Sequence, residues 1–252
     1  MGRKLKQMMD HWPQGTVAVL PWLASFGIYR QLADNYVRSG LLNRLSNGAY
    51  AQAKDPINYL GGLYAIQTHL NGCVHIGGLS AFQYYIKKLS FLEMDPVMLF
   101  AVPEEKIPRW FKQTEWGRRF RTFKTNLFNH NRRLGIERFQ AGDFEIKIST
   151  LERAVMEVLY LVPNKMDYEK VVQLMGHVKT LRPLLVQSLL EDCTSVKVKR
   201  LFLFLAEAHH HEWLQSIDLS RVDLGSGKRV IAGGGQFHAK YQLSLPPMEL
   251  IS

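Results

Sequence analysis

The chain has 252 residues, of which 46% are hydrophobic, and its formal net charge at pH 7 is +10. This hydrophobic content supports folded cores and excludes a disordered chain. No run approaches the roughly 18 apolar residues that a membrane span needs, and no signal peptide follows the first residues. We therefore expect a cytoplasmic protein with no membrane partner, whose positive charge favours a polyanion such as nucleic acid.

The positive charge is concentrated in two stretches. Residues 1–55 hold seven Lys and Arg against three acidic residues, and residues 106–138 hold ten against two. The remainder of the chain is slightly acidic, so each basic stretch needs its own explanation.

The beginning of the chain predicts short elements separated by proline and glycine. We expect a helix over 3–12, a strand or helix lead-in over 16–19, and a helix over 20–26 with Pro21 in its first turn. Gly27 ends that second helix, because glycine accepts the left-handed conformation common after helices.

Residues 28–39 predict a helix with two different faces. Its apolar stripe holds Leu32, Ala33, Tyr36 and Val37. The opposite face carries Arg30, Gln31, Asp34, Asn35 and Arg38. Arginine pairs with guanine edges, and asparagine and glutamine pair with adenine edges, so this polar set suits DNA bases.

A tight hairpin follows this helix. Residues 41–45 and 49–51 flank the turn Ser46-Asn47-Gly48, and Asn-Gly is the strongest short hairpin signal. Helix, turn, polar-faced helix and hairpin is the order of a winged helix-turn-helix. The alternative is a helical subdomain with a solvated polar face and a structural hairpin. The DNA-binding residues that we predict are Arg30, Gln31, Asn35, Arg38, Arg44, Asn47 and Lys54.

The rest of the chain predicts mixed strands and helices. Asp55 with Pro56 starts a helix to about Leu70, and Ser149 with Glu152 forms a capping box for a helix that ends at Pro163. We also expect strands at 74–76, 97–102, 144–148, 229–232 and 241–245, and helices at 79–85, 167–177, 181–192 and 195–214. Because no βαβ rhythm appears, the predicted fold is α+β, with a winged helix-turn-helix over 1–55 and a mixed α/β domain over 56–252.

The second basic stretch interleaves cations with aromatic residues. These side chains could follow a phosphate backbone or an acidic protein surface, or the aromatics could be core and the cations their solvated partners. The residues that we assign to a functional basic surface are Lys112, Arg118, Arg119, Arg121, Lys124, Arg132 and Arg133.

No pattern indicates catalysis. His209-His210-His211 near a helix end favours a solvated face over a metal site, because consecutive helical residues point in different directions. Cys73 and Cys193 lie far apart in sequence and are expected to be core thiols. We expect no enzyme activity, no metal and no cofactor.

Several segments together resemble a known family, the AbiE-type antitoxins. They are Trp12-Pro-x-Gly15-Thr-Val, Gln31-Leu-Ala-x-x-Tyr36-Val-x-Ser-Gly40, Leu60-Gly-Gly-Leu-Tyr64-Ala-x-Gln67, His75-x-Gly77-Gly78-x-x-Ala81, Phe144-Glu-Ile-Lys-Ile-Ser149-x-x-Glu152-Arg153-Ala154 and Ser195-Val-Lys-Val-Lys-Arg200-Leu-Phe. These regulators are encoded beside nucleotidyltransferase toxins in abortive-infection systems, a phage defence classified as type IV toxin–antitoxin. The segments span nearly the whole chain in a shared order.

The resemblance implies a repressor that binds inverted repeats in its own operator and a C-terminal domain with antitoxin activity. The cognate nucleotidyltransferase toxin is then a functional antagonist, and direct contact with it stays an open question. A second hypothesis is a DNA-binding regulator whose C-terminal domain senses a ligand or acts on nucleic acid. A pocket with convergent polar groups would favour this second hypothesis.

Overall fold

The computed structural model describes residues 3–86, 96–231 and 235–246, and it has the α+β architecture that the sequence predicts. The chain divides into two compact units. The first holds residues 1–76, 93–124 and 137–148, and the second holds 77–92, 125–136 and 149–252. Each unit is described by itself below.

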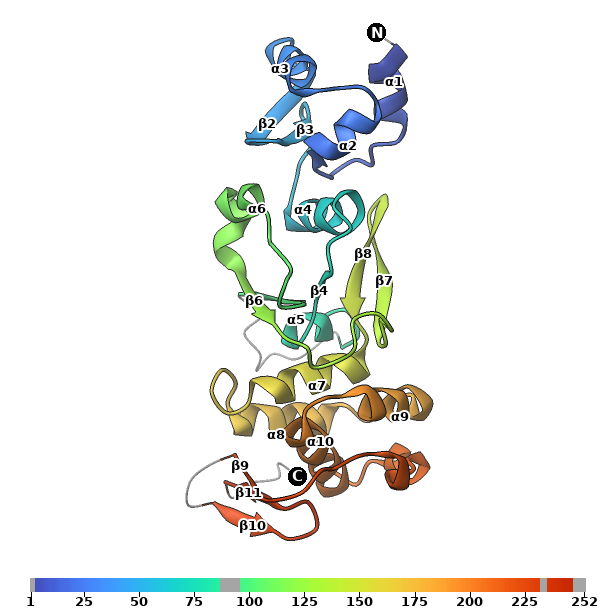
Figure 1. The fold of residues 1–252 in the computed structure, drawn as a ribbon, viewed down its shortest axis with the longest axis vertical. Helices are drawn as coiled ribbons and strands as arrows, with labels where there is room; N and C mark the ends of the chain where they lie inside the picture. The colour runs from blue at the N-terminus through green and yellow to red at the C-terminus, as the bar shows by residue number, and fades with distance from the viewer. Residues whose placement is uncertain (1–2, 87–95, 232–234, 247–252) are drawn as a thin grey trace. The chain divides into compact units, whose positions relative to one another are not determined.

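The first unit begins with a winged helix-turn-helix (Figure 1). Its helices are α1 (Arg3–Asp10), α2 (Leu20–Ser25) and α3 (Arg30–Arg38). Its strands β1 (Ala18–Val19), β2 (Leu42–Ser46) and β3 (Ala49–Gln52) form an antiparallel sheet in the order β1-β3-β2. Met8, Leu23, Ile28 and Ala33 are fully buried between these elements, so the domain has its own core.

The wing has the tight turn that the sequence predicts. Ser46 and Ala49 lie opposite each other across β2 and β3, which leaves Asn47 and Gly48 as the connection. Gly48 has a φ of +82°, a conformation that side chains with a Cβ rarely adopt. The main-chain oxygen of Gly48 accepts a hydrogen bond of 3.0 Å from the amide of Leu20, so the wing tip is fastened to the start of α2.

The helix after the wing begins later than predicted. Helix α4 spans Tyr59–Tyr64 and continues as the π-helix η1 (Ala65–His69). Asn58 caps it by accepting a hydrogen bond of 2.9 Å from the amide of Leu60. The predicted cap at Asp55 is wrong, because its carboxylate instead accepts a hydrogen bond of 2.6 Å from the amide of Gly15. Local signals could not reveal this partner forty residues away.

The first unit also contains a five-stranded sheet (Figure 1). The strand order is β6-β5-β4-β8-β7, with β4 at Val74–Ile76, β5 at Val97–Ala101, β6 at Phe120–Lys124, β7 at Ile136–Ala141 and β8 at Phe144–Ser149. Strand β4 is antiparallel to β5 and parallel to β8, and β5 is parallel to β6. Between β5 and β6 lie α6 (Arg109–Gln113) and the 3-10 helix η2 (Glu115–Arg119).

The buried amide of Gln67 joins η1 to this sheet. Its Nε2 donates to the main-chain oxygens of Val74, at 2.8 Å, and Lys147, at 3.1 Å, and its Oε1 accepts from the amide of Lys147 at 2.7 Å. The side chain therefore pairs with β8 as a neighbouring peptide would.

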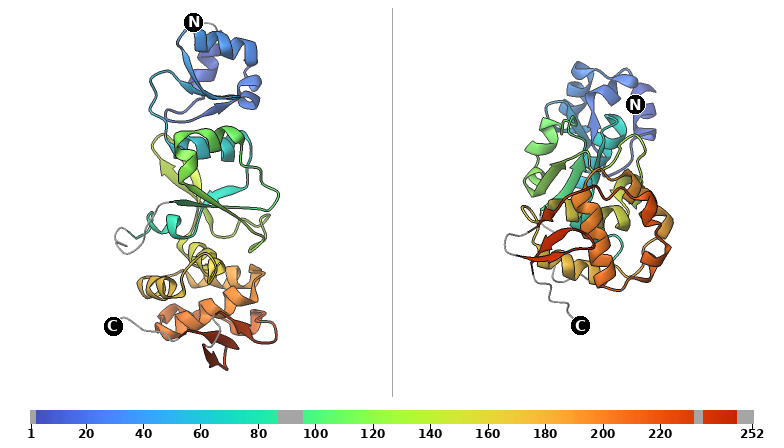
Figure 2. Two further views of the ribbon diagram at one scale, coloured as in Figure 1. Left: turned by 90° about the vertical axis from the view of Figure 1, so that its left-hand side faces the viewer. Right: turned by 60° about the horizontal axis from the view of Figure 1, so that its bottom comes forward.

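The second unit is mainly helical (Figure 2). Its helices are α5 (Leu79–Phe82), α7 (Leu151–Leu161), α8 (Tyr168–His177), α9 (Pro183–Asp192) and α10 (Val196–Ala208), followed by the 3-10 helices η3 (Glu212–Ser216) and η4 (Leu219–Arg221). The tail strands β9 (Arg229–Val230), β10 (Gln236–His238) and β11 (Leu243–Leu245) form a sheet in the order β10-β11-β9. Strand β10 was not predicted. The last predicted helix, 195–214, stops at Ala208.

The predicted capping box at the start of α7 is wrong. The N-cap residue is Thr150, and Ser149 is the last residue of β8. The hydroxyl of Ser149 donates a hydrogen bond of 2.8 Å to the carboxylate of Glu157. Glu152 accepts from the main-chain amide and guanidinium of Arg182, at 2.8–3.0 Å. Hydrogen bonding to Arg182 outweighs burial and lowers the pKa of Glu152, although burial is the largest single influence.

Two further side-chain expectations were also wrong. Cys193 is buried as expected, whereas Cys73 is exposed. The histidine run is not a solvated face, because His211 is buried and its Nε2 lies 2.9 Å from the main-chain oxygen of Met175. His210 is the exposed member of the run.

Candidate nucleic-acid interface

The polar face of α3 is exposed along its whole length. Arg30, Gln31, Asn35 and Arg38 are all exposed, while Ala33 on the opposite face is fully buried. Tyr29, which immediately precedes the helix, is 68% exposed and adds an aromatic ring at the same end. Tyr29 carries no distinctive sequence signal, because its position at the N-cap is set by the turn after Ile28.

Two side-chain contacts connect α3 to the wing. Nη1 of Arg30 donates to Oδ1 of Asn47 at 2.6 Å, which joins the first residue of the helix to the wing turn. Arg44 on β2 forms an ion pair with Asp34 in the middle of the helix. The hydroxyl of Tyr50 also donates to Asp34, at 3.3 Å. Helix and wing therefore present one connected surface.

The remaining predicted DNA-binding residues divide into two places. Nη2 of Arg38 donates to Oδ1 of Asn35 on the same face of α3. Lys54 lies beyond Gln52, at the base of the hairpin and away from the turn at Asn47. Lys54 is exposed and has a φ of +65°. The structure thus brings Arg30, Arg44 and Asn47 together and leaves Lys54 at the other end of the wing.

Asp34 is the residue that sequence reasoning undervalued at this surface. Its carboxylate neutralises Arg44 and places a negative charge on the face that the sequence predicts to meet DNA. The hydrogen bond and the charge of Asp34 raise the pKa of the Arg44 guanidinium. Arg44 therefore has a partner inside the protein before it meets any nucleic acid.

The basic stretch 106–138 does not form one continuous element. Lys112, on α6, and Arg119, Arg121 and Lys124 belong to the first unit, whereas Arg132 and Arg133 belong to the second. The backbone of Arg118 lies in η2, and its side chain falls outside the described part of the structure. The two portions therefore have to be tested separately.

Most aromatic residues of the stretch are core rather than surface. Trp110, Phe111 and Phe123 are buried, so they are not available for stacking on bases. The cations are exposed, but some already have partners. Lys124 donates to the main-chain oxygen of Pro103 at 3.0 Å, and Arg132 lies 3.5 Å from Asp192.

The first unit also places α6 beside the wing. Oγ of Ser46, the last residue of β2, donates to Oε1 of Gln113 on α6 at 3.4 Å. Lys112 precedes Gln113 and is exposed. No signal in the sequence could indicate this proximity, because 67 residues separate the two partners.

The cations of α10 are not an alternative surface. Lys199 is 4% exposed and Arg200 is 2% exposed. Lys197 donates its ammonium hydrogen bonds to the main-chain oxygens of Tyr160, at 2.9 Å, and Val162. Lys197 and Arg200 thus hold α10 to neighbouring segments by hydrogen bonds, and Lys199 is buried, so these cations are not presented to a partner.

Comparison with known families decides the identity. A model described as "Transcriptional regulator, AbiEi antitoxin N-terminal domain" matches residues 1–88, and one described as "Transcriptional regulator, AbiEi antitoxin, Type IV TA system" matches residues 94–246. The chain belongs to the AbiEi family. This AbiEi protein is thus a transcriptional regulator and the antitoxin of a type IV toxin–antitoxin system, as the sequence resemblance implied.

Solved structures share the fold of this AbiEi protein. The RV2827C protein from Mycobacterium tuberculosis, known from its crystal structure, matches with a TM-score of 0.59 over 96% of this chain and 89% of that one. The two sequences are 14% identical, so the likeness concerns the fold alone. No curated protein sequence matches the chain significantly.

Among the residues that the structure describes, no helix is long and apolar enough to cross a membrane. No group of three or more His, Cys, Asp or Glu in the same described ranges is placed to hold a metal ion.

Proposed function

We propose that this AbiEi protein represses its own operon by reading inverted repeats with α3, and that it opposes a nucleotidyltransferase toxin without catalysing a reaction itself. The observation that supports the first part is the connected surface of α3 and the wing. An exposed helix face with Arg30, Gln31 and Asn35 offers the side chains that pair with guanine and adenine edges. Acting on operator DNA would place the protein in the bacterial cytoplasm.

The contacts within this surface suggest different roles for its residues. Arg30 is held toward the wing by Asn47, so it would exchange this hydrogen bond for one to a base. In Gln31, no side-chain hydrogen bond occupies the amide within the described part of the chain. Arg44 and Lys54 lie on or beyond the wing and would contact phosphates, which position the protein without reading sequence.

We assign the antitoxin activity to the exposed cations of residues 106–138. Like charges on one surface repel and carry a folding cost, so a chain that keeps them is expected to use them. The partner would be the toxin or the nucleic acid that the toxin modifies. Because α6 lies beside the wing, Lys112 could also serve DNA binding, and the test must separate the two activities.

A growth-rescue assay run beside an operator gel shift tests both assignments. One double variant, Arg119→Glu with Arg121→Glu, reverses charge in the first unit, and another, Arg132→Glu with Arg133→Glu, reverses it in the second. We expect at least one of them to abolish rescue from the toxin while changing operator affinity much less. Arg30→Ala with Asn35→Ala should show the reverse pattern, with operator affinity weakened by roughly 1–3 kcal/mol per base contact.

A matched control is Lys170→Glu with Lys179→Glu, which reverses two exposed charges near α8. It should leave rescue and operator binding unchanged. Full rescue by both basic-stretch variants, with intact folding, would show that those arginines are a solvated face. Unchanged operator affinity in the α3 variant would contradict the assignment of the reading helix.

A further inference from the structure

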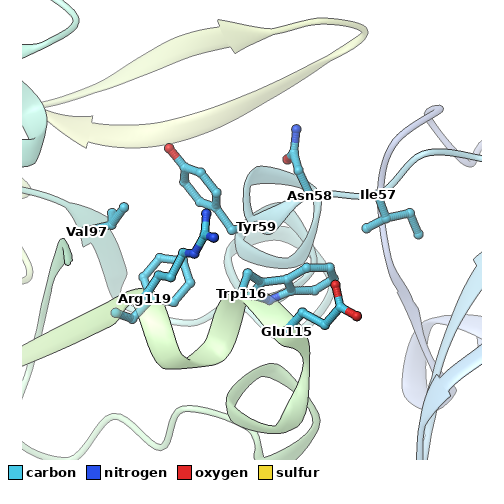
Figure 3. Close-up of a pocket in the computed structure, with 8 residues that line it drawn as sticks. Ile57, Asn58, Tyr59, Val97, Glu115, Trp116 and Arg119 are labelled. Carbon is cyan, nitrogen blue, oxygen red and sulfur yellow. The ribbon is translucent and has the colours of Figure 1, made fainter. Parts of the chain in front are cut away.

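A pocket of about 650 Å³ lies in the first unit, between the start of α4 and the segment η2–β6 (Figure 3). This volume falls within the range of small-ligand sites. Its lining residues are Ile57, Asn58, Tyr59, Val97, Glu115, Trp116, Arg119 and Phe120. In Figure 3, the guanidinium of Arg119 extends toward Tyr59, and the side chains of Trp116 and Glu115 extend toward the side of Ile57.

Three aromatic rings form walls of this pocket, and two of them pack on a buried aromatic residue on the side away from the pocket. The rings of Tyr59 and Phe120 meet edge to face with centroids 5.4 Å apart. Buried Phe111 packs on Phe120 at 5.0 Å and on Trp116 at 6.5 Å. A Cβ on Gly62 would lie 3.0 Å from the ring of Phe111, so glycine at this position lets α4 pack closely on these rings. The aromatic walls are therefore preformed.

The polar groups of the pocket are mostly unoccupied. Within the described residues, no hydrogen bond or ion pair engages the guanidinium of Arg119, the carboxylate of Glu115 or the hydroxyl of Tyr59. Asn58 uses its Oδ1 to cap α4, which leaves its amide nitrogen to donate elsewhere. A cation, an anion and two neutral polar groups thus line one aromatic cavity without satisfying one another.

We propose that this pocket binds a mononucleotide. The base would stack on the aromatic walls, because every base has a face that stacks on such rings. The phosphate would pair with the guanidinium of Arg119, which is suited to bidentate phosphate contacts. Glu115 would accept from a ribose hydroxyl or an exocyclic amine.

The pocket also has a path to the DNA-binding surface. Ile57 and Asn58 belong to the short connection that leaves the wing after β3, and η2 directly follows α6, whose Gln113 meets Ser46 of the wing. A nucleotide that orders either segment would therefore alter the position or mobility of the wing. The nucleotide could be free or could be one unit of a single strand, since both present the same base and phosphate.

Calorimetric titration of the purified full chain tests the proposal. The probes are AMP, GMP, CMP and UMP, and separately a short single-stranded oligonucleotide of each base. We expect saturable binding of at least one probe, weakened about tenfold or more by Arg119→Gln and by Tyr59→Leu. A mononucleotide that binds as well as the strand identifies a free nucleotide, and stronger binding of the strand identifies a strand end.

The matched control is Arg109→Gln on α6, which removes the same charge from an exposed position outside the pocket. It should retain the affinity of the parent chain, and thermal melts should show that all variants fold. The absence of binding by every probe would overturn the proposal, as would equal losses in Arg119→Gln and Arg109→Gln. Because no toxin and no duplex DNA are present, this result is independent of the growth-rescue and operator tests.

Discussion

At the scale of single residues, Asp34 sets how much positive charge the surface of α3 and the wing would offer to DNA in the proposed complex. Its carboxylate holds Arg44 and accepts a hydrogen bond from Tyr50, so one predicted phosphate contact is neutralised in the free protein. An exposed ion pair of this kind contributes little to stability. Its main effect is therefore expected on binding.

We predict that Asp34→Asn strengthens non-specific DNA binding. The change removes one negative charge and releases Arg44, so the slope of log affinity against log salt should steepen by about one unit. The measurement is a salt titration on an unrelated duplex, with Asp10→Asn on α1 as a control for the loss of charge alone. A slope equal to that of the control would contradict the role given to Arg44.

At the scale of elements, helix α2 and the π-helix η1 meet through the half-buried His69, whose two ring nitrogens are shielded from solvent. The ring of His69 stacks on Trp22 with centroids 4.5 Å apart and meets Tyr64 edge to face. Burial lowers the pKa of His69 to about 4, because charging the ring in this apolar contact is unfavourable. The unfolded chain, with a pKa near 6.5, takes up this proton more readily.

We therefore predict that acid weakens this contact. The stability contributed by neutral His69 is fully present above pH 6.5 and is lost as the pH falls toward 4. The loss amounts to up to about 3 kcal/mol. Urea unfolding at pH 7.5 and pH 4.5 measures it, with His69→Phe as a variant that can stack but cannot titrate. If both proteins lose the same stability on acidification, His69 is not the group responsible.

A second element-scale prediction concerns α10 and the tail. Buried Arg200 donates to the main-chain oxygens of Leu224, Gly225 and Gly227 at 2.6–3.0 Å. Arg200→Met leaves these acceptors unpaired and should lower the free energy of unfolding by about 2–4 kcal/mol. Arg200→Lys should not restore this stability, because an ammonium group lacks the planar array of donors that a guanidinium has. Hydrogen exchange over 222–231 should accelerate in both variants.

The control for this prediction is Arg229→Met in the same loop. Among the described residues, the Arg229 side chain donates to main-chain oxygens within three residues of itself, so its loss should leave α10 and the tail joined. Normal protection of 222–231 in Arg200→Met would show that the tail is held by its strands alone.

Local signals predicted elements well and long-range contacts poorly. The turn at Asn47-Gly48 and the end of α7 before Pro163 followed from the chemistry of two or three adjacent residues. Asp55 and Glu152 had the right local spacing for caps, but Gly15 and Arg182 engage them from across the fold. A hydrogen-bond partner that tertiary packing brings close cannot be predicted from a few adjacent residues.

At the scale of the whole molecule, the placement of the basic stretch, residues 106–138, also could not be predicted from local sequence. Its charge was visible in the sequence, but its division between two compact units was not, because the chain leaves the first unit after Lys124 and returns at Glu137. The exposed face of α3 could be predicted because helical periodicity alone defines it. Its connection to the wing through Asp34 and Asn47 required the structure.

The central claim is that this AbiEi protein recognises a specific operator through its winged helix-turn-helix. The most direct test is an anisotropy titration of the full chain, at fixed salt, on DNA from immediately upstream of its own coding sequence and on a shuffled duplex of the same composition. We predict an affinity for the upstream DNA at least about 10³-fold higher, and a loss of this preference in Arg30→Ala with Asn35→Ala. Equal affinity for the two duplexes would contradict the claim.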